Sequence, residues 1–151
     1  SIMAPVTVAR ALRLLELAVV GVLVAAVVVW FGDRGARAEV VDGSAPDGWQ
    51  TISYEGVRVD IPGDWERLDP DDCEFEFETW APPGTTGCDG EVGISFYGSA
   101  TFDPCCRPGI RRTEGGWGGY TYAGDYAVHA GGSDRDLLEQ ILDSARPRSR
   151  G

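Results

Sequence analysis

The chain has 151 residues, with 24 acidic and 13 basic side chains and a formal net charge of −11 at pH 7. Residues 39–151 hold 22 of the acids and 9 arginines, so this part alone carries a net charge of −13 (9 minus 22). A surface of this charge repels nucleic acid and anionic lipid headgroups, so nucleic acid is excluded as an expected partner.

A long apolar run at residues 11–31 predicts a membrane-spanning helix. Its 21 residues would form a helix of about 31 Å, close to the ~30 Å hydrocarbon core of a bilayer. Arg10 and Arg13 lie at its start, and Trp30 lies near its end, where an aromatic ring suits the membrane interface. We therefore expect a cytoplasmic tail at 1–10, a signal anchor at 11–31, and the lipid bilayer as a partner.

A cleaved signal peptide is the alternative interpretation of the same run. Ala36-Arg37-Ala38 has the A-x-A pattern of signal peptidase sites, and cleavage near Ala38 would release a secreted, soluble ligand-binding domain. The full apolar run is longer than the ~7–15 residues typical of a signal peptide, which favours the anchor. Both interpretations place the C-terminal part outside the cytoplasm, and the anchor leaves the N-terminus inside.

The cysteines also indicate an extracytoplasmic location. All four follow the apolar run, and an even number in a small exported domain is typical of disulfides: Cys73, Cys88, Cys105 and Cys106. A bond between the adjacent Cys105 and Cys106 would force an unusual peptide geometry, so we expect each to bond with Cys73 or Cys88, in either pairing. Zinc is disfavoured because no C-x₂-C spacing exists and the single histidine, His129, is remote in sequence. No metal and no other cofactor is expected.

Residues 32–48 are polar and contain glycine, alanine and proline, which predicts a linker before a domain at 49–146. The segments 51–54 and 57–61 alternate apolar and polar residues around Glu55-Gly56, which predicts a hairpin. Two more strands are predicted, one at 73–79 with Cys73, Phe75 and Phe77 inward, and one at 92–97 with Val92, Ile94 and Phe96 inward.

The last elements are a second hairpin and a helix. The segments 117–122 and 126–130 flank Ala123-Gly124-Asp125. After them, Ser133 is the expected N-cap of a helix that ends before Pro147, leaving a disordered tail at 147–151. The helix carries one apolar stripe: Leu137, Leu138, Ile141, Leu142 and Ala145. The predicted fold class is α+β, an antiparallel sheet packed by one C-terminal helix, in two layers behind the N-terminal transmembrane helix.

The sequence Tyr-Glu-Gly-Val-Arg-Val-Asp-Ile-Pro-Gly-Asp-Trp at 54–65 resembles the opening of small PsbP-like domains. It is similar to exported actinobacterial domains that close on a helix like the one expected near the C-terminus. This resemblance implies a binding or assembly module and assigns a role to no individual residue.

Two surfaces are candidates for a binding site. Glu74, Glu76 and Glu78 alternate with the inward residues of 73–79, so we expect a wet acidic face. That face is a solvated strand surface, a docking site for a partner with a basic surface, or a Ca²⁺ site, although the EF-hand spacing is absent.

The second candidate surface is the aromatic, glycine-rich stretch at 115–126. Its Trp117, Tyr120 and Tyr122 either pack in the core or stack on a ligand. We expect His129 to lie outward on its strand, exposed and without a role. The leading interpretation is a non-catalytic, disulfide-braced extracytoplasmic binding or assembly domain on a single-pass membrane protein, and the second alternative is a cell-envelope hydrolase that uses His129.

Overall fold

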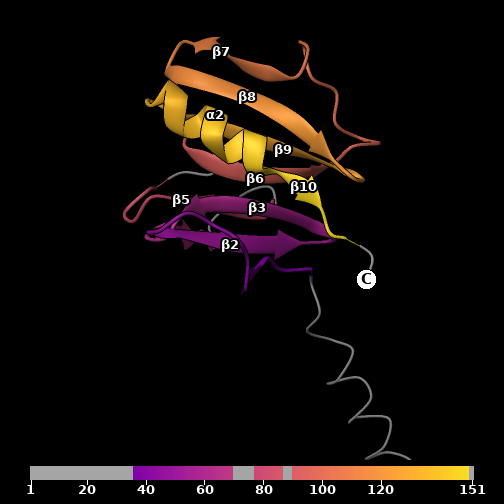
Figure 1. The fold of residues 1–151 in the computed structure, drawn as a ribbon. Coiled ribbons are helices and arrows are strands. Elements are labelled where there is room, and N and C mark those ends of the chain that lie inside the picture. The colour runs from indigo at the N-terminus through magenta and orange to yellow at the C-terminus, as the bar shows by residue number, and fades with distance from the viewer. Residues whose placement is uncertain (1–35, 70–76, 87–89, 150–151) are drawn as a thin grey trace, which may run out of the picture. The chain divides into compact units, whose positions relative to one another are not determined.

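The computed structural model describes residues 36–69, 77–86 and 90–149 (Figure 1). Chain contacts define two compact units, Ser1–Gly35 and Ala36–Gly151, and every described residue belongs to the second. This unit has antiparallel sheets and one C-terminal helix, which confirms the predicted α+β class. The predicted membrane span at 11–31 lies outside the described residues, and no helix within them is long and apolar enough to cross a bilayer.

The strands form two antiparallel sheets, so the expectation of a single sheet is wrong. Sheet A has the order β1 (Glu39–Val41), β2 (Trp49–Tyr54), β3 (Val57–Pro62), β10 (Arg146–Pro147). Sheet B has the order β4 (Glu66–Arg67), β5 (Thr79–Ala81), β6 (Gly93–Gly98), β9 (Tyr126–Gly132), β8 (Gly116–Ala123), β7 (Gly109–Thr113). Long-range pairings such as β6 with β9 and β3 with β10 create this division, and such pairings leave no local signal in the sequence.

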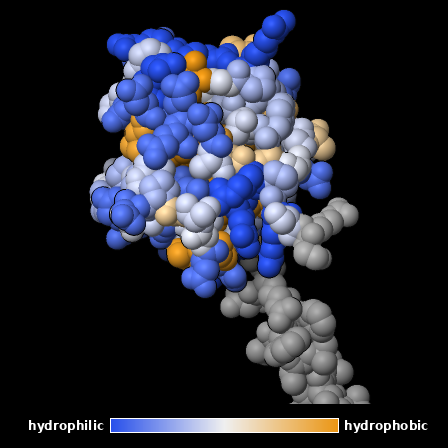
Figure 2. All heavy atoms as spheres, viewed as in Figure 1, coloured by the Kyte–Doolittle hydropathy of each residue, from blue (hydrophilic) through white to orange (hydrophobic). Residues whose placement is uncertain are grey.

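The helix α2 (Arg135–Ser144) packs against β3 of sheet A and against β7, β8 and β9 of sheet B, across which it runs in Figure 1. Its buried residues are three members of the predicted stripe: Leu138, Ile141 and Leu142. They join one core with apolar side chains of both sheets, among them Ile52, Val57, Val59, Ile61, Ile94, Phe96, Val128 and Ala130. From the same side, Figure 2 shows a mostly hydrophilic surface, as expected for the outer half of an amphipathic helix.

Both predicted hairpins are present. β2 and β3 join through Glu55 and Gly56, whose φ angles are 46° and 81°, the left-handed values of a two-residue hairpin turn. β8 and β9 join through Gly124-Asp125. Hairpins of this kind are readable from sequence because both strands and their turn are contiguous.

The helix begins one residue later than expected. Asp134, not Ser133, is the N-cap, because its carboxylate accepts hydrogen bonds from the backbone N–H groups of Asp136 and Leu137, each at 3.1 Å. The prediction that Val92 points inward is also wrong, because it precedes β6 and is 42 % exposed. Ile94 and Phe96 of β6 are buried in the core as predicted.

The folded unit extends beyond both expected ends. Within the predicted linker at 32–48, β1 pairs with β2 and Ala38 is buried in the core. Beyond the helix, β10 includes Pro147 and pairs with β3. β7 was not anticipated, although the Glu114-Gly115 turn that follows it repeats the Glu55-Gly56 pair of the first hairpin.

A buried carboxylate fastens the C-terminal segment to sheet A. Asp60 accepts a hydrogen bond from Thr51 Oγ1 at 2.6 Å, and its other oxygen lies 3.1 Å from Arg146 Nη1. Its backbone N–H donates to Ser144 Oγ at 2.8 Å. The end of α2 and the start of β10 are thus held by one residue of β3, which fixes how the helix covers sheet B.

Candidate functional site

Sheet B has one face toward the core and one face, here called the outer face, that neither α2 nor sheet A covers. On β9, Val128 and Ala130 point into the core, so His129 points to the outer face, as its predicted phase requires. The register sets His129 between Ser95 of β6 and Tyr120 of β8. Residues in phase with these three make up the outer face.

Five aromatic side chains lie in contact along the outer face, and we call them the aromatic row: Phe77, Tyr97, Phe102, Tyr120 and Tyr122. Successive ring centroids are 4.7, 5.1, 5.0 and 5.4 Å apart, in tilted or edge-to-face arrangements that aromatic pairs favour. Both ends of the row are open, since Phe77 is 42 % and Tyr122 47 % exposed.

The middle of the aromatic row is fixed and uncharged. Burial raises the pKa values of Tyr97 and Tyr120, so both remain neutral phenols at physiological pH. Tyr120 also donates a hydrogen bond to the carbonyl oxygen of Cys106 at 2.6 Å, which holds the loop between β6 and β7 over the sheet.

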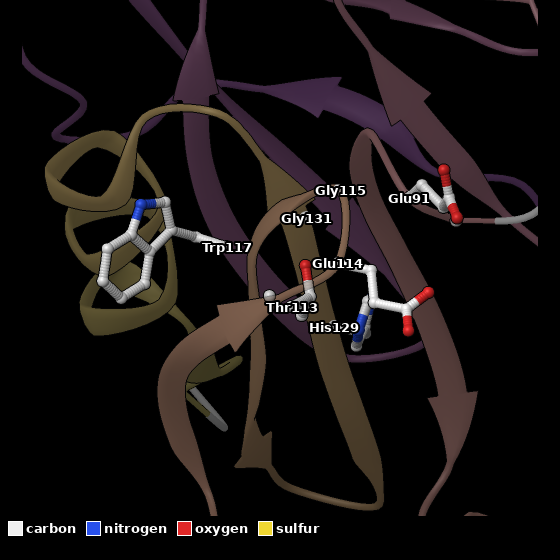
Figure 3. A pocket seen from close by; sticks show the side chains of 9 residues that line it. Glu91, Thr113, Glu114, Gly115, Trp117, His129 and Gly131 are labelled. Atoms are coloured by element: carbon white, nitrogen blue, oxygen red, sulfur yellow. The ribbon is translucent and has the colours of Figure 1, made fainter.

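Two neighbouring cavities open beside the aromatic row. The acidic cavity, of about 260 Å³, is bordered by Glu91, Glu114 and Trp117, and Figure 3 shows Trp117 on one side and the two glutamates on the other. The aromatic cavity, of about 380 Å³, is lined by Tyr97, Phe102, Pro104, Cys105, Cys106, Arg111 and Tyr120. Thr113, Gly118 and His129 line both cavities, so the two spaces adjoin at these residues.

His129 occupies the junction between the cavities. Its ring meets Tyr97 edge-on, with centroids 6.3 Å apart, and its Nδ1 is buried with no hydrogen-bond partner among the described residues. Burial lowers the pKa of His129 below its usual value, so the ring is neutral at pH 7. The expectation of an exposed histidine is therefore wrong: His129 faces outward, but Tyr97 and neighbouring residues cover it.

Glycines make room for the junction. A Cβ atom on Gly118 would lie 3.2 Å from Thr113 Cγ2 and 4.0 Å from His129 Nε2. A Cβ atom on Gly131, which pairs with Gly118, would lie 2.5 Å from the carbonyl oxygen of Glu91. The segment before β6 can cross over β9 only because Gly131 has no side chain.

The predicted aromatic site is only partly assembled. Tyr120 and Tyr122 are neighbours in the aromatic row, two residues apart on one strand face. Trp117 lies three residues before Tyr120 on the same strand, so it points to the opposite face of sheet B, toward the core. There Arg112 and Arg135 lie over its ring, with guanidinium carbons 5.2 and 5.7 Å from the ring centroid. It reaches the acidic cavity only at the edge where β8 begins.

The predicted acidic face is wrong at Glu78. This carboxylate is buried, accepts hydrogen bonds from Arg67 and Trp80, and has the same phase as Trp80, a core residue. Phe77, expected inward, is exposed in the aromatic row instead. Glu74 and Glu76 lie outside the described residues.

The cysteines can be placed only in part. Cys105 and Cys106 are not bonded to each other and line the aromatic cavity, whereas Cys73 and Cys88 lie outside the described residues. The two disulfides therefore stay a prediction. Among residues 36–69, 77–86 and 90–149, no group of three or more histidine, cysteine, aspartate or glutamate side chains is placed to hold a metal ion.

Several residues of the outer face and its cavities were not singled out as site residues from the sequence: Phe77, Tyr97, Phe102, Glu91 and Glu114. Tyr97 alone had a local signal, since it lies on the polar phase of the 92–97 strand.

Comparison with protein-family models, with curated protein sequences and with solved structures finds no match to this chain. Function is therefore inferred from the geometry of the outer face, and the PsbP-like resemblance stays a prediction.

Proposed function

We propose that this chain is a single-pass membrane protein whose α+β domain lies outside the cytoplasm and acts as a non-catalytic binding module, with the outer face of sheet B as its binding site. The observation that carries this proposal is the aromatic row. Its rings contact one another on a sheet face that neither α2 nor sheet A covers, and its ends are exposed. Exposed aromatic rings gathered on one face are a feature of binding sites, because they offer a ligand a large apolar contact area.

The location rests on the sequence. The apolar residues 11–31 match the thickness of a bilayer, and every cysteine follows them. Two disulfides that join Cys105 and Cys106 to Cys73 and Cys88 would brace the loop that borders the aromatic cavity. A secreted form, cleaved near Ala38, would carry the same binding face without the anchor.

The hydrolase alternative has a specific observation in its favour, since His129 is neutral and borders both cavities. A catalytic histidine is usually oriented by a hydrogen bond from its second nitrogen to a carboxylate or carbonyl group. In the described part of the chain, Nδ1 of His129 has no such partner, and burial alone lowers its pKa. The binding module therefore accounts for more of the geometry.

Two experiments test the proposal. Alkaline carbonate extraction of membranes should leave the full chain in the pellet, because a spanning helix resists extraction. Release into the supernatant, or a mature N-terminus at Glu39, would contradict the anchor and support the secreted form.

The binding face is tested by a photo-crosslinking amino acid, p-benzoyl-phenylalanine, placed at Tyr122 in the aromatic row. The matched control places it at Asp143, an exposed position on α2. In intact cells, a discrete adduct should form from position 122 and not from position 143, and Phe102→Ala should reduce it. Equal labelling from both positions, or adducts from position 143 alone, would rule out the outer face as the binding site.

A further inference from the structure

We infer that the two cavities form one bipartite site for an extended peptide segment, with a cationic side chain in the acidic cavity and an aromatic side chain in the aromatic cavity. This inference rests on the proposed binding function and names the class of ligand. The partner is thus defined by a pattern of arginine or lysine beside an aromatic residue.

The shared lining makes the site bipartite. Thr113, Gly118 and His129 border both cavities, so a ligand that fills one lies against the other. Each cavity, at about 260 and 380 Å³, lies below or near the low end of the ~300–1,000 Å³ typical of drug-sized ligands. Such a volume fits one side chain, and two adjoining volumes fit two side chains of one peptide.

The charge of the acidic cavity selects a cation. Glu91 lies just before β6 and Glu114 lies in the turn between β7 and β8, and both are exposed. A Cβ atom on Gly115 would lie 3.8 Å from Glu91 Oε2, so this carboxylate reaches the turn that holds Glu114. Two carboxylates from separate segments therefore meet at one cavity, in a region whose net charge of −13 (9 minus 22) attracts basic partners over longer distances.

The aromatic cavity selects a flat, uncharged group. Tyr97, Phe102 and Tyr120 present rings, and the two tyrosines are neutral phenols. The cation in this cavity is Arg111, whose guanidinium donates to the carbonyl oxygen of Arg107. Arg111 repels a second basic side chain, so the positive group is directed to the acidic cavity and the ring to the aromatic cavity.

His129 at the junction suits a polar peptide backbone. Its ring is neutral at pH 7, so it adds no positive charge that would oppose the cation. Its Nε2 lies on the side of Gly118, which also lines both cavities. A peptide crossing the junction would pass over this imidazole and the glycine.

The test uses the full chain in lipid nanodiscs and the probe peptide acetyl-Tyr-Gly-Arg-Gly-Tyr-amide, titrated by calorimetry. Side chains two residues apart share one face of an extended peptide, so a tyrosine on either side of the arginine covers both binding directions. The reference peptide replaces arginine with citrulline, which has nearly the same shape and no charge. The arginine peptide should bind at least about fivefold more tightly than the citrulline peptide, because its guanidinium would pair with the exposed carboxylates of Glu91 and Glu114.

Matched variants distinguish the effect of the two carboxylates at the acidic cavity from the effect of the protein's net charge. Glu91→Gln with Glu114→Gln should reduce the affinity for the arginine peptide about fivefold and leave the citrulline peptide unchanged. Glu55→Gln with Asp143→Asn removes the same charge at exposed positions elsewhere and should change neither affinity by more than about twofold.

Equal affinity for the two peptides would overturn the inference and leave the proposed function standing if Phe102→Ala still weakens both. Absence of binding by both peptides would also overturn the inference. The proposed function would then be decided separately by the crosslinking at position 122. If that experiment gives no adduct from either position 122 or position 143, the proposed binding function itself is contradicted.

Discussion

Arg67 holds Glu78 through both nitrogens of one edge of its guanidinium, with Nε 2.9 Å from Oε1 and Nη2 3.0 Å from Oε2. Trp80 Nε1 donates to the same carboxylate at 2.9 Å, and the Glu78 side chain is only 2 % exposed. The hydrogen bond to Glu78 raises the pKa of Arg67. Glu78 therefore stabilises the edge of sheet B where β4 meets β5, and a partner protein cannot reach it.

Glu78→Gln should lower the free energy of unfolding by about 2 kcal/mol, because it removes hydrogen bonds between charged groups that burial shields from water. The matched control is Glu139→Gln on α2. Glu139 pairs with Arg135 at the same N–O distance of 2.9 Å, but about half of each side chain is exposed. This control should cost no more than about 0.5 kcal/mol. Urea unfolding in micelles measures the free energy of unfolding of both variants. Equal losses of stability in the two variants would contradict the structural role of Glu78.

The only histidine in the chain should give the domain a measurable pH dependence. Burial lowers the pKa of His129 in the folded state, whereas the unfolded chain keeps the usual value near 6.5. As the pH falls through that value, the unfolded state binds the proton first, so stability is lost on acidification. The free energy of unfolding should therefore fall between pH 7.5 and 5.5 by more in the wild type than in His129→Gln. Identical slopes would show that His129 is not shielded from water.

Gly131 and Gly118 face each other across β9 and β8, and alanine should lower stability at the first position and peptide affinity at the second. In Gly131→Ala the new methyl group would lie 2.5 Å from the backbone oxygen of Glu91 and should cost about 1–3 kcal/mol, because backbone cannot yield cheaply. In Gly118→Ala the nearest atom is the methyl group of Thr113 at 3.2 Å, on an exposed residue that can shift.

Gly118→Ala should therefore change the free energy of unfolding by less than about 1 kcal/mol. It should also narrow the junction between the cavities and lower the affinity for the probe peptide. Calorimetric unfolding and peptide titration of the same samples separate the two effects. Normal peptide affinity in a folded Gly118→Ala protein would argue against a ligand that crosses the junction.

The predicted disulfides can be tested directly on the native protein. If the four cysteines are paired as proposed, thiol titration after unfolding without reductant should find no reactive thiol. Reduction should then destabilise the domain by about 2–5 kcal/mol, as is typical of small exported domains. Detection of four free thiols, or of stoichiometric zinc, would contradict the disulfide assignment.

The local elements of this protein were predictable from its sequence. Glu55-Gly56 and Gly124-Asp125 lie between alternating segments, and Leu138, Ile141 and Leu142 recur with helical spacing, so the two hairpins and α2 followed directly. The outward phase of His129 and the core position of Ile94 also followed from alternation. Each of these features depends on interactions between residues close in sequence.

Which side chains contact one another across the fold could be seen only in the tertiary structure. Glu78 is buried with its carboxylate satisfied by Arg67 and Trp80, and Phe77 packs against Tyr97 in the aromatic row instead of in the core. The proposed binding face combines Glu91, Glu114 and Phe102, which come from three separate loops and share no spacing in the sequence. Local sequence patterns were enough to predict the hairpins and the helix, since local hydrogen bonds and periodic burial stabilise these elements. The two-sheet division and the candidate site depended on long-range pairing, in which charge compensation and close backbone packing select the neighbours that each side chain meets.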